Sequence, residues 1–198
     1  MNKNIFLALA LIAFSAVSYG QAKVAMGIKG GLNLSSIDRT ATAGETYKSA
    51  TGFHGGLFAT IKIAKIGIQP EVLFSKQVTT QTDNSGDTDW NLQYVTIPVM
   101  IKWYMVKGLN LQVGPQFGML TSAAQETAVG STDIKSDLKS SDWSLGAGIG
   151  FDAPFKLNIE ARYVIGLSDI NNFAGASESI KNRTIQISLG YRFLDKGN

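Results

Sequence analysis

The sequence predicts an all-β protein, namely an eight-stranded, antiparallel, up-and-down transmembrane β-barrel. Residues 184–193 alternate apolar and polar side chains with a period of two, and this period gives a strand two unlike faces. Charged residues make up 17% of the chain, whereas soluble domains average about 25%. Beyond residues 1–20 the chain has no apolar run of helix length. An exported chain of this composition fits a barrel with lipid outside and a filled, wet interior.

Residues 1–20 have the features of a secretory signal peptide. Lys3 supplies a positive start, residues 5–17 are apolar, and Ser18-Tyr19-Gly20 forms a small-x-small cleavage site. The apolar stretch is shorter than the about 20 residues of a spanning helix. Cleavage before Gln21 would leave residues 21–198 as a single outer-membrane β-barrel domain.

Charge and cysteine content exclude several classes of function. Without Lys3 the chain has 17 basic and 15 acidic residues. It has neither a basic run nor a basic groove lined with aromatic residues, so nothing points to nucleic acid. The chain has no cysteine, which rules out disulfides, thiolate metal sites and cysteine nucleophiles.

The predicted strands follow one another without a linker. They cover residues 23–35, 51–63, 66–78, 90–104, 108–121, 142–152, 156–168 and 181–193. Most are long enough to cross a bilayer, for which about 9–11 residues suffice. The connections alternate between tight turns (64–65, 105–107 and 153–155) and longer polar segments (36–50, 79–89, 122–141 and 169–180). Outer-membrane barrels have this layout, with the short turns in the periplasm and the long loops outside the cell.

The alternation assigns a face to each strand residue. The first strand turns Met26 and Ile28 outward and Lys29 inward, while the second turns Leu57 outward and His54 inward. A slip of one residue would exchange the two faces. It would place the inward charges in lipid, at about 2–4 kcal/mol each near the midplane. The sequence therefore specifies the register strongly.

Aromatic residues and prolines occupy particular places in the predicted strands. Outward aromatic residues gather near strand ends, as in the aromatic girdles of membrane proteins. They are Phe53, Trp143 and Tyr163 towards the long loops or the middle, and Trp103, Phe151 and Phe193 towards the turns. Pro70 and Pro98 lie inside predicted strands, where each removes a ladder donor. We expect both prolines at bulges or at the barrel rim.

Inward-facing charged residues form the most substantial candidate site. They are Lys29, Lys62, Glu71, Lys102, Glu160, Arg162 and Arg192, with Gln69, Gln112, Gln116 and Gln186 around them. Side chains fill the interior of an eight-stranded barrel, and charges enclosed there must pair. We therefore expect a salt-bridged plug. A narrow passive ion path is the alternative, because a mobile network would let ions through.

His54 is the single histidine of the chain, and it faces inward near the long-loop end of its strand. Some small outer-membrane barrels modify lipid A with a histidine and a serine at that rim, where Ser35 and Ser75 also lie. A triad needs a serine and a carboxylate within reach of the imidazole, and no G-x-S-x-G signature is present. We expect a hydrogen-bonding histidine and no catalytic residue. A lipid A-modifying enzyme that uses His54 stays an alternative.

Two further motifs have structural explanations. Residues 83–89 are rich in oxygen-bearing side chains, but they lack the bidentate glutamate of a calcium loop, so a hairpin loop is expected. Gly146-x-Gly148-x-Gly150 lacks the βαβ context of a nucleotide-binding fingerprint, so these glycines are expected to face inward. The sequence predicts no metal and no cofactor.

Five strand segments share a recognisable pattern. They are Gly27-Ile28-Lys29-Gly30-Gly31-Leu32-Asn33, Tyr94-Val95-Thr96-Ile97-Pro98-Val99, Gly114-Pro115-Gln116-Phe117-Gly118, Ala161-Arg162-Tyr163 with Gly166-Leu167, and Leu189-Gly190-Tyr191-Arg192-Phe193. With these motifs the chain resembles the PorT-like small outer-membrane β-barrel domain family of the Bacteroidota. That family usually has a glutamate where Thr96 stands. The resemblance implies an eight-stranded outer-membrane barrel, generally without a defined activity, and one relative takes part in protein secretion.

The expected function is that of an integral protein of the Gram-negative outer membrane with a structural or interaction role. Its expected surroundings are outer-membrane lipid and lipopolysaccharide, with a protein partner at the long loops and no nucleic acid. The alternatives are the narrow pore, the lipid A-modifying enzyme and a soluble lipocalin-like carrier. A carrier would expose charged faces to water and line its cavity with bulky apolar groups.

Overall fold

The computed structural model describes residues 22–38, 46–83, 86–127, 130–168 and 181–196. Its elements are β1 (Ala22–Asp38), β2 (Thr46–Ile63), β3 (Ile66–Asp83), β4 (Gly86–Tyr104), β5 (Leu109–Thr127), β6 (Gly130–Asp133), the 3-10 helix η1 (Lys135–Asp137), β7 (Ser141–Asp152), β8 (Leu157–Gly166) and β9 (Lys181–Lys196). The predicted signal peptide and the predicted loop 169–180 lie outside the described residues. In the described part of the chain, no helix is long and apolar enough to cross a membrane.

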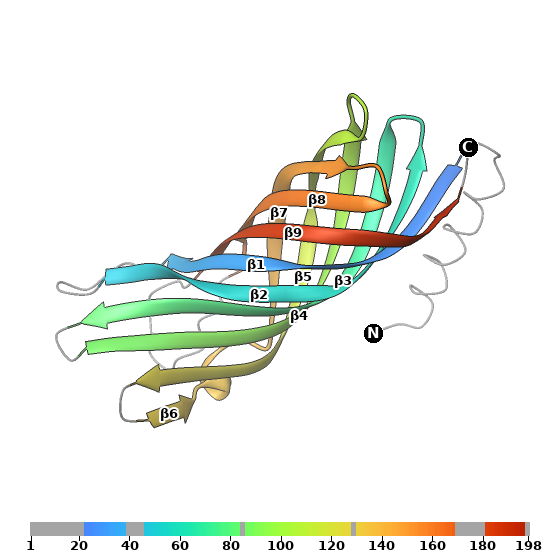
Figure 1. Ribbon diagram of the computed structural model, residues 1–198. Helices are drawn as coiled ribbons and strands as arrows, with labels where there is room; N and C mark the ends of the chain where they lie inside the picture. The colour runs from blue at the N-terminus through green and yellow to red at the C-terminus, as the bar shows by residue number, and fades with distance from the viewer. Residues whose placement is uncertain (1–21, 39–45, 84–85, 128–129, 169–180, 197–198) are drawn as a thin grey trace, which may run out of the picture.

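Eight of these strands form a closed antiparallel ring, as predicted (Figure 1). Each strand pairs with the next from β1 to β5, β5 pairs with β7, and β7, β8 and β9 follow in order. β9 pairs with β1, which closes the ring. Figure 1 shows the tight turns gathered at one end, at the upper right, and long strands that reach the other end. We call these the short-turn end and the long-loop end.

At the long-loop end the strands extend further than the alternation predicted. The predicted loop 79–89 is mostly a continuation of the β3–β4 hairpin, in which Asp83 pairs with Gly86. The predicted loop 122–141 contains η1 and the additional strand β6, which pairs with the end of β5 outside the ring. Alternation marks strands that have lipid on one face. At this end the alternation of apolar and polar side chains stops, but the backbone ladder continues.

The outward wall of the ring is apolar and the inward wall is polar. Leu32, Leu57 and Leu189 are 54%, 58% and 57% exposed, whereas Asn33 and Lys102 are fully shielded. The six aromatic residues of the predicted girdles are all exposed as well. Such a wall is suited to acyl chains, because apolar side chains cover the backbone ladder on the lipid side.

The prediction that Pro70 and Pro98 lie at bulges or at the rim is wrong. In the β3–β4 ladder, the pairs Pro70↔Val99 and Leu73↔Thr96 have the same register, so no residue is inserted between them. Only the two pairs between these, one of which would contain Pro98, are missing from the ladder. The β2–β3 ladder skips the pairs at Pro70 in the same way. Each residue of an antiparallel strand directs its N–H towards one neighbour only. A proline therefore interrupts one ladder while the other ladder preserves the register.

β5 contains a bulge that the sequence pattern did not reveal. Tyr94 of β4 pairs with Leu120, but Gln93 pairs with Ser122, so Thr121 is an extra residue in β5. A bulge exchanges the faces of a strand beyond it. The predicted strand ended at residue 121 because even-numbered residues face inward up to Leu120, whereas beyond the bulge the odd-numbered Ala123 is buried.

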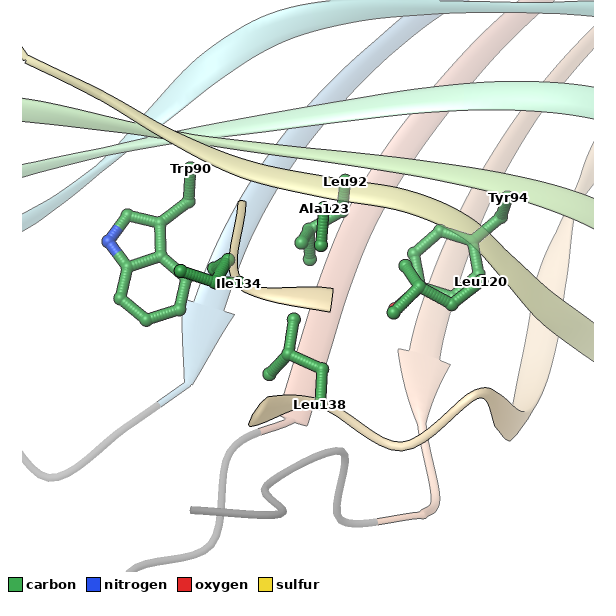
Figure 2. Packing of buried hydrophobic residues seen from close by; sticks show 7 residues of the cluster. All are labelled: Trp90, Leu92, Tyr94, Leu120, Ala123, Ile134 and Leu138. Atoms are coloured by element: carbon green, nitrogen blue, oxygen red, sulfur yellow. The ribbon is translucent and has the colours of Figure 1, made fainter. Parts of the chain in front are cut away.

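Beyond this bulge a hydrophobic cluster fills the long-loop end (Figure 2). Its members are Trp90, Leu92, Tyr94, Leu120, Ala123, Ile134 and Leu138. Figure 2 shows Ile134 and Leu138, the residues on either side of η1, packed beneath the side chains of β4 and β5. We call residues 86–94, 120–127 and 130–138 the extension, since the cluster holds them together beyond the polar lumen.

Candidate functional site

Five of the seven predicted interior charges meet inside the barrel. Lys29 comes from β1, Glu71 from β3, Lys102 from β4, and Glu160 and Arg162 from β8. Their side chains are buried, with exposed fractions between 0% and 4%. Residues two apart on a strand share a face, so Glu160 and Arg162 both point into the lumen. We call these five residues the interior charge network.

Arg162 connects the two carboxylates of the network. Its Nη1 donates to Glu71 Oε2 at 2.9 Å and its Nη2 to Glu71 Oε1 at 2.5 Å. The same Nη2 donates to Glu160 Oε2 at 2.6 Å. A guanidinium that binds a carboxylate through two nitrogens is fixed in direction as well as charge. In the ring β3 lies across from β8, so this pairing spans the lumen.

Two lysines complete the ion pairs. Lys29 Nζ donates to Glu71 Oε1 at 3.0 Å and also to Glu160 Oε2. Lys102 Nζ donates to Glu160 Oε1 at 2.8 Å. Glu71 thus contacts two cations and Glu160 contacts three. Transfer of the Glu71 and Glu160 carboxylates from water to the barrel interior costs free energy, and the several cations that contact each carboxylate offset that cost.

Amide and hydroxyl side chains surround the network. Gln69 donates to Glu71 at 2.7 Å and to Glu160 at 3.1 Å, and it accepts from Lys102 at 2.7 Å. Thr60 donates to Gln69 at 2.8 Å, while Gln112 accepts from Arg162 Nε at 3.0 Å. Of the other predicted glutamines, Gln186 donates to Asn33 and Gln116 is buried. Together these contacts fix the network across the lumen.

Lys62 and Arg192 lie apart from the network, at the short-turn end. Lys62 Nζ lies 3.7 Å from the centroid of the Tyr104 ring. Arg192 Nη1 lies 3.6 Å from Asp152 Oδ2 and 3.4 Å from Asp195 Oδ2. Both cations occupy inward positions near the ends of their strands, so they reach the mouth of the barrel and not its centre.

Asp152 joins the two groups of charges, and the sequence analysis did not identify it. Its Oδ1 lies 3.7 Å from Lys102 Nζ and accepts a hydrogen bond from Asn158 at 2.8 Å. Its Oδ2 accepts from the Tyr104 hydroxyl at 2.9 Å. The alternation through β7 places Asp152 on the inward face, so the period of two was a signal that could have found it.

His54 is buried and bonded to neutral partners. Its Nδ1 lies 2.8 Å from Asn33 Oδ1 and its Nε2 lies 2.8 Å from Ser188 Oγ. Neither predicted serine hydrogen-bonds it: Ser75, which pairs with His54 in the β2–β3 ladder, accepts from Asn33 Nδ2, and Ser35 bonds Thr184. No carboxylate within the described residues hydrogen-bonds His54. The imidazole faces the interior, away from the lipid side of the wall.

The remaining motifs have structural roles. A Cβ at Gly148 would lie 2.2 Å from the Ala161 carbonyl oxygen, and one at Gly150 would lie 2.8 Å from Asn110 Oδ1, so Gly148 allows a close backbone approach and Gly150 makes room for a lumen side chain. In the segment 83–89, Asp89 accepts a hydrogen bond from Thr80 across the β3–β4 hairpin at 2.6 Å. The described residues contain no group of three or more metal-ligating side chains that could hold a metal ion.

Comparisons with known proteins agree with this architecture. A family model described as "Outer membrane protein beta-barrel domain" matches residues 18–172. The chain is similar in structure to Neisserial surface protein A (NspA), with a TM-score of 0.55, 11% identity, and coverage of 85% of this chain and 97% of NspA. It is also similar to Ail, the attachment invasion locus protein of Yersinia pestis, in complex with the heparin analogue sucrose octasulfate. That match has a TM-score of 0.52, 18% identity, and coverage of 87% of this chain and 99% of Ail. Likeness at these identities shows the fold alone. No curated protein matches the chain.

Proposed function

The chain belongs to the family of outer membrane protein β-barrel domains, and from that premise we propose that it holds a folded interaction surface outside the cell without catalysing a reaction. The protein resides in the outer membrane. The hydrophobic cluster of the extension carries the proposal. Burial of a Trp or Leu side chain stabilises a defined shape by about 1.5–3 kcal/mol. A connection that only joins two strands does not need such a shape, whereas binding surfaces do.

The interior charge network supports a sealed lumen in this proposal. An eight-stranded barrel is only wide enough for side chains to fill it, and here each buried carboxylate binds at least two cations. The narrow pore is therefore the weaker alternative. A soluble carrier is disfavoured, because the outward wall is apolar and the lumen contains ion pairs in place of an apolar cavity.

The charge of the long-loop end indicates the kind of partner. The segments 36–50, 79–89, 122–141 and 169–180 together contain ten acidic and four basic residues. Lys181 and Arg183 of β9 pair with Asp38 and Ser36 at the same end, and ten acidic against six basic residues leave a net charge of −4. The potential of such a surface attracts cations and repels anions. Ail forms a complex with a sulfated heparin analogue, and an acidic outer face disfavours that class of ligand here. We infer a partner with a basic surface.

Binding measurements on the full chain in nanodiscs test this proposal with two probes, a cationic lysine polymer and a sulfated polysaccharide. We expect the lysine polymer to bind and the polysaccharide not to bind. The triple variant Glu126→Gln, Asp133→Asn, Asp137→Asn removes exposed or half-buried carboxylates of the extension and should weaken binding of the lysine polymer.

Asp195→Asn, at the short-turn end, is the matched control and should leave that binding unchanged. Stronger binding of the sulfated polysaccharide, or an equal loss in the control variant, would contradict the proposal.

The enzymatic alternative depends on His54. The hydrogen bonds of His54 to Asn33 and Ser188 inside the lumen favour a structural role. Mass spectrometry of lipid A from cells that express the wild type or His54→Ala separates the two functions. We expect identical lipid A masses. A mass change that requires His54 would make the protein a lipid A-modifying enzyme.

The proposal extends to the signal peptide, the family subgroup and the surroundings of the barrel. We propose that residues 1–20 are a cleaved signal peptide and that residues 21–198 form the barrel domain, with its short-turn end in the periplasm. Motifs such as Leu189-Gly190-Tyr191-Arg192-Phe193 support membership of the PorT-like group of the Bacteroidota. Lipid and lipopolysaccharide would surround the apolar wall, and a protein partner would bind the extension.

A further inference from the structure

A charged pocket opens at the short-turn end of the barrel, away from the extension. Its volume is about 210 Å³, well above the roughly 30 Å³ that one water molecule occupies. Its walls include Lys23, Lys62, Tyr104, Asp152, Arg192 and Asp195. All of these residues belong to the part of the chain that the structure describes.

Lys62 brings a cation to this pocket without a carboxylate partner. Its ammonium lies 3.7 Å from the centroid of the Tyr104 ring, a cation–π geometry that orients the charge but leaves its N–H groups available. Within the described residues, no carboxylate oxygen lies in ion-pair distance of Lys62. An ammonium in this position can donate hydrogen bonds to a ligand.

Arg192 brings a second cation with an unused donor. Its Nη2 donates to the Ala153 carbonyl at 3.0 Å, and its Nη1 is 3.6 Å from Asp152 and 3.4 Å from Asp195. Its Nε is buried and has no hydrogen-bond partner. A buried donor without a partner costs free energy, so the carbonyl and the two carboxylates do not fully satisfy Arg192, and this residue lines the pocket.

The carboxylate of Asp152 is already neutralised from the side of the lumen. It accepts hydrogen bonds from Tyr104 and Asn158 and lies 3.7 Å from Lys102. Asp195 lies beside Arg192. The lining thus has three cations, Lys23, Lys62 and Arg192, against these two carboxylates.

The whole short-turn end is positive. Its charged residues are Lys23, Lys62, Lys65, Lys107, Lys156, Arg192 and Lys196 against Asp152 and Asp195. A cleft surrounded by one sign of charge concentrates the opposite ion. Anions in the periplasm or in the adjoining leaflet are therefore drawn to this pocket.

We propose that the pocket binds a phosphate group. A phosphate oxygen would accept from Lys62 Nζ, and Arg192, which also lines the pocket, would attract the anion as a second cation, since both side chains bind phosphate. The three cations of the lining against two carboxylates suit an oxyanion. Free phosphate and the headgroup of an anionic phospholipid in the facing leaflet both offer this chemistry. The site is independent of the interaction surface proposed above.

Titration of the full chain in uncharged detergent with inorganic phosphate tests the site. Phosphorus NMR of the added phosphate and the thermal unfolding midpoint are the two measurements. We expect broadening of the phosphate signal and a rise in the midpoint. Lys62→Met keeps the aliphatic stem and should weaken binding about tenfold or more, a change of about 1.4 kcal/mol per decade. Lys62→Arg should retain binding.

Lys65→Met is the matched control. Lys65 carries the same charge three positions away in the β2–β3 turn and does not line the pocket. Phosphate binding should survive in this variant. Equal losses in Lys65→Met and Lys62→Met would overturn the proposal, as would a wild type that neither broadens the signal nor shifts its midpoint. The heat-dependent mobility of each variant on gels verifies that its barrel is folded.

Nanodiscs separate the two sources of phosphate. If a phospholipid headgroup is the ligand, discs of phosphatidylglycerol should abolish the binding of free phosphate, whereas discs of phosphatidylcholine should leave it intact. If free phosphate is the ligand, binding should persist in both kinds of disc. Either pattern supports the site, and loss of binding in both lipids overturns it.

Discussion

At the scale of single residues, Arg162 holds the two interior carboxylates together. It contributes three of the charge-assisted hydrogen bonds to Glu71 and Glu160, over distances of 2.5 to 2.9 Å. Lys29 and Lys102 reach the same carboxylates as point charges. Removal of the guanidinium would leave buried negative charge without its directional partner.

We predict that Arg162→Leu destabilises the barrel by about 3–5 kcal/mol, the range seen when one member of a buried ion pair is removed. Arg162→Lys keeps the charge but loses the two-nitrogen contact, so its loss should be smaller. Urea unfolding in detergent measures the loss of stability in both variants. Lys139→Leu, at an exposed position, is the control and should leave the midpoint unchanged. An unchanged midpoint for Arg162→Leu would refute the role given to this residue.

Two adjacent glycines of β1, Gly30 and Gly31, allow a comparison of the same substitution at an open position and at a crowded one. A Cβ at Gly31 would lie 1.9 Å from the Ile187 carbonyl oxygen, whereas a Cβ at Gly30 would have only an ordinary contact of 3.6 Å to the His54 carbonyl oxygen. We predict that Gly31→Ala costs about 1–3 kcal/mol, as overpacking does. Gly30→Ala should be neutral or stabilising by up to about 1 kcal/mol, because alanine restricts the unfolded chain. Equal unfolding midpoints for the two variants would show that the close backbone approach at Gly31 is not limiting.

At the scale of elements, the bulge in β5 and the 3-10 helix η1 together build the extension. The bulge at Thr121 turns Ala123 inward, and η1 places Ile134 and Leu138 against the same cluster (Figure 2). The cluster therefore holds η1 in place, whereas β6 is held by its ladder with the end of β5.

We predict that the double variant Ile134→Ala, Leu138→Ala loosens the extension and leaves the barrel intact. Large-to-small changes in a core cost about 2–5 kcal/mol each, and besides this cluster the segment is held by the short β5–β6 ladder and by backbone hydrogen bonds to β5. Limited proteolysis should cut between residues 120 and 141 much faster in the variant. The heat-dependent gel mobility of the barrel should not change. Cutting at the wild-type rate would mean that the cluster does not maintain the extension.

At the scale of the whole molecule, charge is distributed in three zones along the barrel. The short-turn end is basic, the middle of the lumen holds compensated ion pairs, and the long-loop segments are acidic. The two ends therefore favour different ligands. The middle zone separates them because its side chains bridge β8 to the strands across the ring.

We predict that the wild-type barrel shows no steady single-channel steps in planar bilayers. Ions would have to displace Arg162 and Lys29 from Glu71 and Glu160 to pass, and a wide-barrel geometry that avoids this is absent with eight strands in the ring. A porin of known conductance verifies that the bilayers report openings. Reproducible conductance steps from the purified chain would show that the interior charge network opens to ions and does not seal the lumen.

The predicted and the observed elements differ in the parts of the strands where apolar and polar side chains no longer alternate. Lys29, Glu160 and Arg162 could be placed inside because lipid on one face enforces the period of two. In the strand extension and in the cluster beyond Thr121 that period no longer applies. Pro98 was misjudged because a missing donor was equated with a change of register, although the register is preserved at Pro70↔Val99 and Leu73↔Thr96.

The amino-acid pattern predicted the barrel class and placed Lys29, Glu71, Lys102, Glu160 and Arg162 inside, since both follow from a local rule that lipid imposes on every second side chain. It missed Asp152 and did not separate Lys62 and Arg192 from the network. The tertiary structure alone decided which charges pair. Arg162 and Glu71 are 91 residues apart in the chain, and only closure of the ring brings their strands face to face. The same closure separates Lys62 and Arg192 from the network and leaves them at the mouth, where a ligand can reach them.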